Sequence, residues 1–207
     1  QKVWLDSGSA VLSDGEKQIR LPLDGATTLG ESNQDNLLAA LAAIWSLGVD
    51  PKRAINGLLD FKPLPHRSEH IATRNGVRFV NDSKATNPGA AQRALESTKA
   101  PTLWIAGGRD KGLSFEGLAE TARGRVRVAL LIGEAASQLE SHLAGIVPCE
   151  RMASLEEAVH RATEWAEDGD VVLLAPACAS FDQFENFEAR GECFRGAVLR
   201  IVEGNPQ

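Results

Sequence analysis

Three runs of continuously apolar residues in the second half of the chain constrain its fold more than any other feature. They occupy residues 103–106, 128–132 and 171–175, and each is followed by a loop and then by a helical pattern. A strand that is apolar on both faces suits the centre of a parallel sheet, which helices cover on both sides. Alternation of such strands with helices therefore predicts an α/β fold with a mostly parallel sheet and helices on both faces.

Turn and capping signals place the other elements of this half. Asn75-Gly76 is a hairpin signal, and a return strand is expected at 77–80. Ser154 followed by Glu157 is typical of a capping box at the start of a helix. The predicted helices span residues 88–97, 115–122, 134–143, 155–167 and 183–202.

The first 61 residues have a different pattern. Residues 1–24 contain short β-like segments with a turn at Asp14-Gly15, and so few strands cannot bury a core alone. Two helices follow, one capped by Ser32 with Asp35 and a second that begins at Asp50-Pro51. Two prolines within residues 62–65 then interrupt any helix. We therefore predict an incomplete part at 1–61 and a complete domain at 62–207.

Composition excludes several classes of protein. The 207 residues are 43% hydrophobic and 24% charged, as in ordinary globular proteins, and no stretch approaches the roughly 18 apolar residues of a membrane span. A net charge of −6 argues against a nucleic-acid partner. Three widely spaced cysteines indicate neither a disulfide framework nor a zinc site, and they suit a reducing cytoplasm. Because the chain begins with Gln1 and not Met, we interpret it as processed or partial.

Polar and small residues gather in three loops that directly follow predicted strands. These loops cover residues 81–87, 107–111 and 176–183. Ligands of open parallel sheets bind beyond the carboxyl ends of the strands, so we expect the three loops at one edge of the sheet. Their lysines, their hydroxyls and the start of a helix after Asn87 would all favour an anion. The residues alone thus predict an anion-binding α/β domain.

Several of these residues also have an interpretation without a ligand. Asp82 can serve as a turn residue and helix cap, and Lys111 can be a solvated loop lysine. Cys178 suits a small buried residue better than a nucleophile, since no His is predicted beside it. His66 and His70 flank the start of a strand, where a metal pair is the less favoured alternative.

Four strings of residues stand out: Leu64-Pro65-His66-Arg67, Asn81-Asp82-Ser83-Lys84-Ala85-Thr86-Asn87, Gly107-Gly108-Arg109-Asp110-Lys111 and Pro176-Ala177-Cys178-Ala179-Ser180-Phe181-Asp182-Gln183-Phe184. Taken together, they resemble the Mur ligase family, and the resemblance covers about residue 30 onward. Members have a UDP-sugar domain, a central ATPase domain and a C-terminal Rossmann-like domain. The resemblance implies that 62–207 is the C-terminal domain and 1–61 the tail end of the ATPase domain. The chain lacks the phosphate-loop pattern Gly-x-x-x-x-Gly-Lys-Ser/Thr, so we expect it to be inactive alone.

The strings match best the members that add D-glutamate, and the resemblance implies their reaction. ATP with Mg²⁺ would phosphorylate the carboxylate of UDP-N-acetylmuramoyl-L-alanine, and the amine of D-glutamate would attack the acyl phosphate. The implied setting is cytoplasmic peptidoglycan synthesis, which serves cell shape and division, by a monomer that has neither nucleic acid nor membrane as a partner. The alternatives are another Mur-type or folylpolyglutamate-type ligase, an L-glutamate-adding variant, and a free-standing binding domain.

The resemblance also implies roles for ten residues of this chain. A lysine, two hydroxyls and backbone N–H groups suit the two carboxylates of glutamate. No metal ligand is among the ten, because the magnesium ligands of the family lie mostly in the part of the central domain that this chain lacks. The implied nucleotide-binding residues are Asn33, Asn36, Arg67, Asp82 and Lys84; the implied D-glutamate-binding residues are Thr86, Lys111, Ser180, Phe181 and Phe187; Lys84 and Lys111 are the implied catalytic residues.

Overall fold

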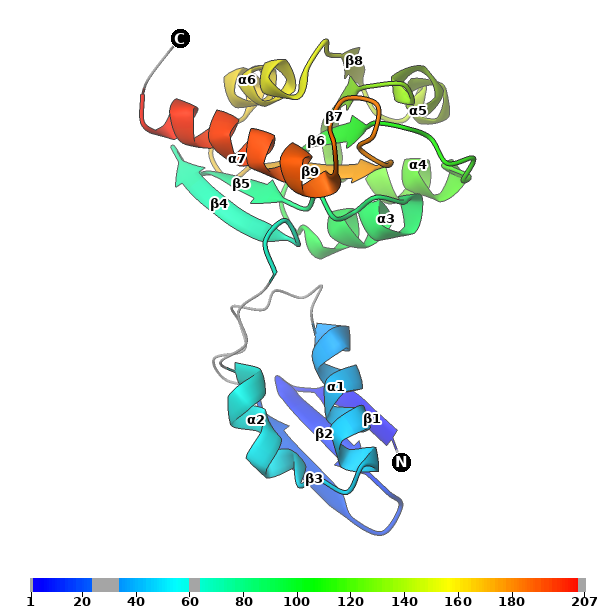
Figure 1. Ribbon diagram of the computed structural model, residues 1–207, viewed down its shortest axis with the longest axis vertical. Coiled ribbons are helices and arrows are strands. Elements are labelled where there is room, and N and C mark those ends of the chain that lie inside the picture. The colour runs from blue at the N-terminus through cyan, green and yellow to red at the C-terminus, as the bar shows by residue number, and fades with distance from the viewer. Residues whose placement is uncertain (1, 24–33, 60–63, 205–207) are drawn as a thin grey trace. The chain divides into compact units, whose positions relative to one another are not determined.

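A computed structural model of the chain describes residues 2–23, 34–59 and 64–204. The chain divides into two compact units, Gln1–Pro63 and Leu64–Gln207, which are described separately (Figure 1). No helix in the described part of the chain is both long enough and apolar enough to cross a membrane.

The first unit packs two helices with a three-stranded antiparallel sheet. Its sheet has the order β1-β2-β3, and the turn between β2 and β3 is closed by the Asp14 carboxylate, which accepts hydrogen bonds from the backbone N–H groups of Glu16 and Lys17. Leu12 and Leu21 of the sheet form one apolar cluster with α1, so the helices supply the cover that three strands lack. The predicted cap at Ser32 lies outside the described residues. The elements are β1 (Lys2–Asp6), β2 (Ser9–Ser13), β3 (Gln18–Pro22), α1 (Gln34–Ser46) and α2 (Pro51–Leu59).

The second unit is built on a six-stranded sheet with the order β4-β5-β9-β6-β7-β8. The hairpin pair β4 and β5 is antiparallel, and every other neighbouring pair is parallel, which confirms the predicted mostly parallel α/β fold. Its strands are β4 (Glu69–Arg74), β5 (Val77–Asn81), β6 (Thr102–Gly107), β7 (Val126–Ile132), β8 (Cys149–Arg151) and β9 (Val171–Ala177), and its helices are α3 (Pro88–Ser97), α4 (Glu116–Ala122), α5 (Ala136–Leu143), α6 (Leu155–Trp165) and α7 (Phe187–Val202).

Helices cover both faces of this sheet, as the apolar runs predict. Side chains of β6 alternate between the faces, with Trp104 in one core and Ile105 in the other. Helices α3, α4 and α5 pack on the Trp104 face, and α6 and α7 pack on the Ile105 face (Figure 1). Trp104 is fully buried, and its indole N–H donates to the Ala175 carbonyl oxygen at 2.8 Å, so this large apolar side chain leaves no polar atom unpaired.

The structure corrects two predictions in this unit. The last helix begins at Phe187 and not at residue 183, because Asn186 caps it by accepting from the Ala189 backbone N–H at 2.7 Å. The preceding residues form a turn instead, in which the Ser180 carbonyl oxygen accepts from the N–H of Gln183 and of Phe184. The three-residue strand β8 was not predicted, since so short an edge strand has no periodicity to detect.

Candidate functional site at the carboxyl edge of the sheet

Three loops meet at the carboxyl edge of the sheet. The loop after β5 meets the end of β9, where the Ala177 N–H donates to the Ala85 carbonyl oxygen at 2.9 Å. The loop after β6 pairs with the loop after β9, because Arg109 and Ala179 exchange two backbone hydrogen bonds of 2.9 and 3.1 Å. The loops at 82–87, 107–111 and 178–182 therefore form one continuous surface, which we term the loop edge.

Gly108 makes this close approach possible. Its φ is +127°, a conformation that favours glycine, and a Cβ there would overlap the Ala179 carbonyl oxygen and lie 3.3 Å from the carbonyl carbon. In the structure the partner in close approach is the neighbouring loop.

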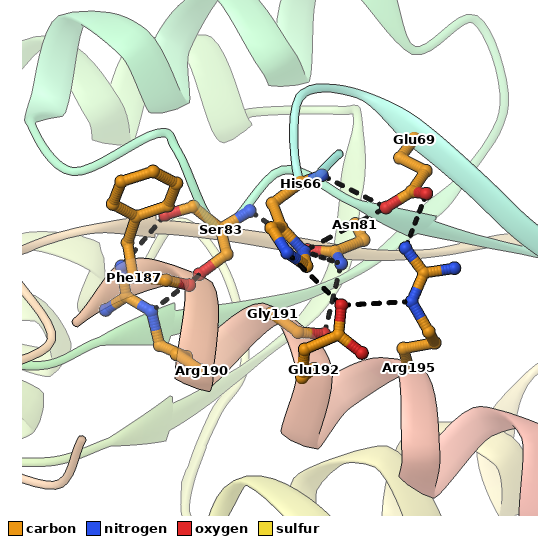
Figure 2. Close-up of polar contacts among 9 residues, drawn as sticks. All are labelled: His66, Glu69, Asn81, Ser83, Phe187, Arg190, Gly191, Glu192 and Arg195. Carbon is orange, nitrogen blue, oxygen red and sulfur yellow. Dashed lines mark hydrogen bonds and ion pairs between the residues drawn. The ribbon is translucent and has the colours of Figure 1, made fainter. Parts of the chain in front are cut away.

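A buried polar cluster lies beneath the first of these loops (Figure 2). Asn81 is fully buried, and its side-chain N–H₂ donates to the Gly191 carbonyl oxygen at 3.1 Å and to His66 Nδ1 at 3.0 Å. Its Oδ1 accepts from the Ser83 backbone N–H at 3.1 Å, so the amide of Asn81 uses both ends. Because the amide donates to Nδ1, the neutral His66 ring carries its proton on Nε2, which faces a Glu192 carboxylate oxygen at 3.3 Å.

His66 joins the start of the second unit to α7. Its φ of +62° is unusual for a residue other than glycine, and its backbone N–H donates to Glu69 Oε2 at 3.0 Å. Arg195 on α7 pairs with both Glu69 and Glu192, which closes the cluster around the His66 ring (Figure 2). A strained residue held by several neighbours typically marks a place where the chain must keep one shape.

The rings of His66 and His70 have different partners. The ring of His66 engages Asn81 and Glu192, whereas His70 Nε2 lies 2.9 Å from Thr73 Oγ1. Across residues 2–23, 34–59 and 64–204, no group of three His, Cys, Asp or Glu side chains is placed to hold a metal ion.

Asp82 opens the loop after β5 in a mostly buried position. Only 8% of the residue is exposed, and burial raises the pKa of its carboxyl to about 6, against smaller opposing effects of Ser68 and Arg67. The Ser68 hydroxyl donates to the carboxylate at 3.4 Å. At pH 7 most of the Asp82 carboxyl is ionised and able to accept hydrogen bonds.

Lys84 and Phe187 come together across the loop edge. The Lys84 Nζ lies 3.9 Å from the centroid of the Phe187 ring, a cation–π contact between the loop after β5 and the start of α7. Thr86 follows two residues later and is half-buried. Two implied site residues from distant parts of the sequence are thereby in direct contact, with a third close by in the chain.

The loop after β9 contains two of the implied D-glutamate-binding residues, one buried and one exposed. Ser180 is only 2% exposed, whereas Phe181 is 61% exposed. Lys111 is exposed on the loop after β6, and Arg67 is half-buried beside His66 in the chain. Asn36 is exposed on α1 of the first unit, and Asn33 lies outside the described residues.

Cys178 has the surroundings of a core residue. It is 2% exposed, and burial raises the pKa of its thiol to about 12, with a further contribution from Asp110. A thiol of this kind is a poor nucleophile at neutral pH, which favours its interpretation as a small buried residue.

One residue that sequence reasoning missed lies at the centre of this site. Arg190 is fully buried, although it sits in a helix whose spacing gives no reason to expect a buried charge. Its guanidinium contacts Ser83 on one loop (Figure 2). It also contacts Cys178 and Ala179 on another loop. No sequence signal distinguishes it from a solvated helix arginine.

Comparison with known proteins assigns the family. The family model "Mur ligase, glutamate ligase domain" matches residues 66–178. Two relatives named UDP-N-acetylmuramoylalanine–D-glutamate ligase are similar to the chain. The one from Desulfitobacterium hafniense (strain Y51) is 41% identical over 92% of this chain and 40% of its own length, and the one from Nitratidesulfovibrio vulgaris (strain DP4) is 45% identical over 84% of this chain and 40% of its own.

The fold is also shared with a solved structure. A pseudomurein peptide ligase type C from Methanothermus fervidus superimposes with a TM-score of 0.68 at 18% identity, over 95% of this chain and 41% of that one. The chain thus spans about two fifths of the length of the curated relatives that it matches. With the family model covering more than half of the sequence, the chain belongs to the Mur ligase family.

Proposed function

We propose that this chain is the C-terminal part of an ATP-dependent ligase that joins D-glutamate to UDP-N-acetylmuramoyl-L-alanine. The supporting observation is that the loop edge assembles in a chain 41–45% identical to relatives that carry this enzyme's name. In this proposal residues 62–207 are the C-terminal domain, and residues 1–61 are the tail end of the ATPase domain. The fuller setting is peptidoglycan precursor synthesis by a cytoplasmic monomer, in support of cell shape and division.

The proposed reaction has two steps. A carboxylate oxygen of UDP-N-acetylmuramoyl-L-alanine attacks the γ-phosphorus of ATP, ADP leaves, and an acyl phosphate remains. The amine nitrogen of D-glutamate then attacks the acyl carbon, phosphate leaves with the electron pair of the broken bond, and the nitrogen loses a proton as the amide forms. Positioning of the reactants and stabilisation of charge are the protein's main contributions.

Nucleotide binding is assigned to two residues of the loop after β5 and to three residues that precede this loop in the sequence. Asp82 would accept hydrogen bonds from the ribose hydroxyls, which its mainly ionised carboxyl permits at pH 7. Arg67 would bind the phosphates, and Lys84 would lie beside the nucleotide. Asn33 and Asn36 of the first unit would face the adenine and ribose. Mg²⁺ would neutralise phosphate charge when bound, and its ligands would lie mostly in the part of the central domain that this chain lacks.

The glutamate side is assigned to four other residues of the loop edge and to Phe187 at the start of α7. Thr86, Ser180 and the backbone N–H of Phe181 would donate hydrogen bonds to the two carboxylates, and Lys111 would supply the opposite charge. Phe187 would line the pocket beside Lys84, which it already contacts. An amino acid with two carboxylates is the ligand that this set of donors suits best.

Steady-state kinetics of the full-length protein test the proposal. ATP and UDP-N-acetylmuramoyl-L-alanine are supplied with either D- or L-glutamate, and phosphate release and the amide product are measured. We expect product only with D-glutamate. Equal or greater turnover with L-glutamate, or with a folate acceptor in place of the UDP-sugar, would overturn the assignment.

The isolated 207-residue chain is the matched control. We propose that it folds but does not hydrolyse ATP, because it lacks the phosphate-loop pattern. Circular dichroism checks folding, and ATP hydrolysis by the purified chain above a buffer blank would contradict this part of the proposal.

A further inference from the structure

Arg190 connects two loops that are almost one hundred residues apart in the sequence. In the described part of the chain its guanidinium donates five hydrogen bonds, all to oxygens of these loops. Its Nε and one terminal nitrogen contact the hydroxyl and the carbonyl oxygen of Ser83, each at 3.0 Å. Its terminal nitrogens also contact the carbonyl oxygens of Cys178, at 3.2 Å, and of Ala179, at 3.3 Å.

The rigid shape of a guanidinium suits this arrangement. Its donors point in fixed directions within one plane, so that oxygens on two separate loops are held at a set spacing. Burial lowers the pKa of Arg190 to about 10, which leaves the group protonated at neutral pH. Carbonyl dipoles and one hydroxyl therefore surround a full positive charge, and hydrogen bonds of this kind are stronger than neutral ones.

Each of the two loops that Arg190 connects carries proposed D-glutamate-binding residues. Ser83 lies three residues before Thr86, and Ala179 directly precedes Ser180. The Ser83 hydroxyl also donates to the Phe187 carbonyl oxygen at 2.8 Å (Figure 2). This hydrogen bond connects the start of α7 to the same loop. Arg190 itself lies one helical turn after Phe187.

We propose that Arg190 is a positioning residue that holds the Thr86 loop and the Ser180 loop at the separation required by the two carboxylates of the amino-acid substrate. This inference rests on the proposed function. It goes further, because it states that the buried Arg190 side chain, which lies behind the proposed pocket, sets the width of that pocket. A buried charge generally adds little net stability compared with an apolar residue of similar size, so a role in geometry accounts better for an arginine here.

Kinetics of the full-length enzyme form the first test. The variants are Arg190→Met, which removes the charge and the planar fork, Arg190→Lys, which keeps the charge alone, and Ser83→Ala, which removes one acceptor. Arg151→Met is the matched control, because Arg151 is exposed on the edge strand β8, where it pairs with Glu140 of α5. We expect the KM for D-glutamate to rise on the order of tenfold to a hundredfold in Arg190→Met, the KM for ATP to change less than about threefold, and Arg190→Lys to lie between wild type and Arg190→Met.

Coupling between the two positions separates positioning from general stability. If Arg190 acts through Ser83, the increase in glutamate KM of the double variant will be smaller than the product of the two single increases. A purely structural role would instead lower the amount of folded enzyme and reduce kcat, without changing the ratio of the two KM values.

Hydrogen exchange in the 207-residue chain provides a test that needs no activity. Arg190→Met should speed amide hydrogen exchange both in peptides that cover 82–87 and in peptides that cover 178–182. Exchange in peptides from β6 and β7 should stay unchanged. Unchanged exchange in both loops, or an unchanged glutamate KM in an active, folded Arg190→Met enzyme, would overturn the inference. If the wild-type enzyme shows no glutamate-dependent turnover, the proposed function fails, and the exchange result still decides whether Arg190 holds the loops.

Discussion

Gly191→Ala should destabilise the protein, although alanine usually stabilises a helix relative to glycine. Gly191 lies inside α7 against the His66 ring. A Cβ at Gly191 would lie 2.6 Å from Cγ and 2.9 Å from Cε1 of this ring, and closer still to Nδ1. Real Cβ atoms do not tolerate such distances, so either the ring or the helix must move.

The expected size of the effect follows from what the ring would lose. Displacement of His66 removes its contact with Asn81 Nδ2, which lies 3.0 Å away in a fully buried environment. An unpaired buried polar group costs about 1–3 kcal/mol, and the helical preference for Ala over Gly offsets about 0.5–1 kcal/mol. The middle values of these two ranges give an expected net loss in free energy of unfolding of about 1 kcal/mol.

Gly196 on the same helix supplies the matched control. A Cβ there would meet only the end of the flexible Arg200 side chain, at 3.4 Å. Gly196→Ala should therefore leave the stability unchanged or raise it by up to about 1 kcal/mol. Urea unfolding at pH 7, analysed with a common m-value, measures both variants.

A double variant identifies the mechanism. Replacing His66 by Ala removes the ring that Gly191→Ala would strike, so the combined loss should be smaller than the sum of the single losses. The reasoning would be refuted if Gly191→Ala were as stable as Gly196→Ala, or if its effect added fully to that of His66→Ala.

Three further predictions concern Asp82, Lys111 and Trp104. The raised pKa of Asp82 means that its contribution to stability is present below the unfolded value near 3.8 and is lost as pH rises toward 6. Asp82→Asn should therefore be more stable than wild type above pH 6 by about 1–3 kcal/mol, and this advantage should disappear near pH 4 in urea titrations. A stability difference between variant and wild type that stays constant across this pH range would contradict the raised pKa of Asp82. Lys111→Ala in the full-length enzyme should raise the KM for glutamate about tenfold to a hundredfold and the KM for ATP less, as expected for the loss of a carboxylate partner worth about 1.5–3 kcal/mol; an unchanged glutamate KM would remove that role. Trp104→Phe should lower the free energy of unfolding by about 1–3 kcal/mol, because the Ala175 carbonyl oxygen loses its indole donor; a thermal or urea melt equal to that of wild type would contradict this.

Much of the second unit could be predicted because its determinants are local. A strand apolar on both faces, such as 171–175, can only be buried in the centre of a covered sheet, and the alternation with helices then determines the class of fold. The parallel order in turn brings the loops after β5, β6 and β9 to one edge, as expected from the chain order alone.

The remaining features depend on contacts between residues that are distant in the sequence. Helix α7 begins only after the turn at 181–186, because Asn186 caps it. The helical pattern in the sequence continues through this turn, so it did not show where the helix begins. The requirement for glycine at position 191 arises from a histidine 125 positions earlier, and at Gly108 from the loop after β9.

By itself, the sequence determined the class of fold and the composition of the loop edge, since both depend on residue type and short-range spacing. Only the tertiary structure placed Arg190 behind this edge, because nothing in the helical pattern of α7 distinguishes a buried guanidinium from a solvated one. The physical reason is that the four oxygens that accept its five hydrogen bonds belong to loops that become neighbours only when the sheet has formed.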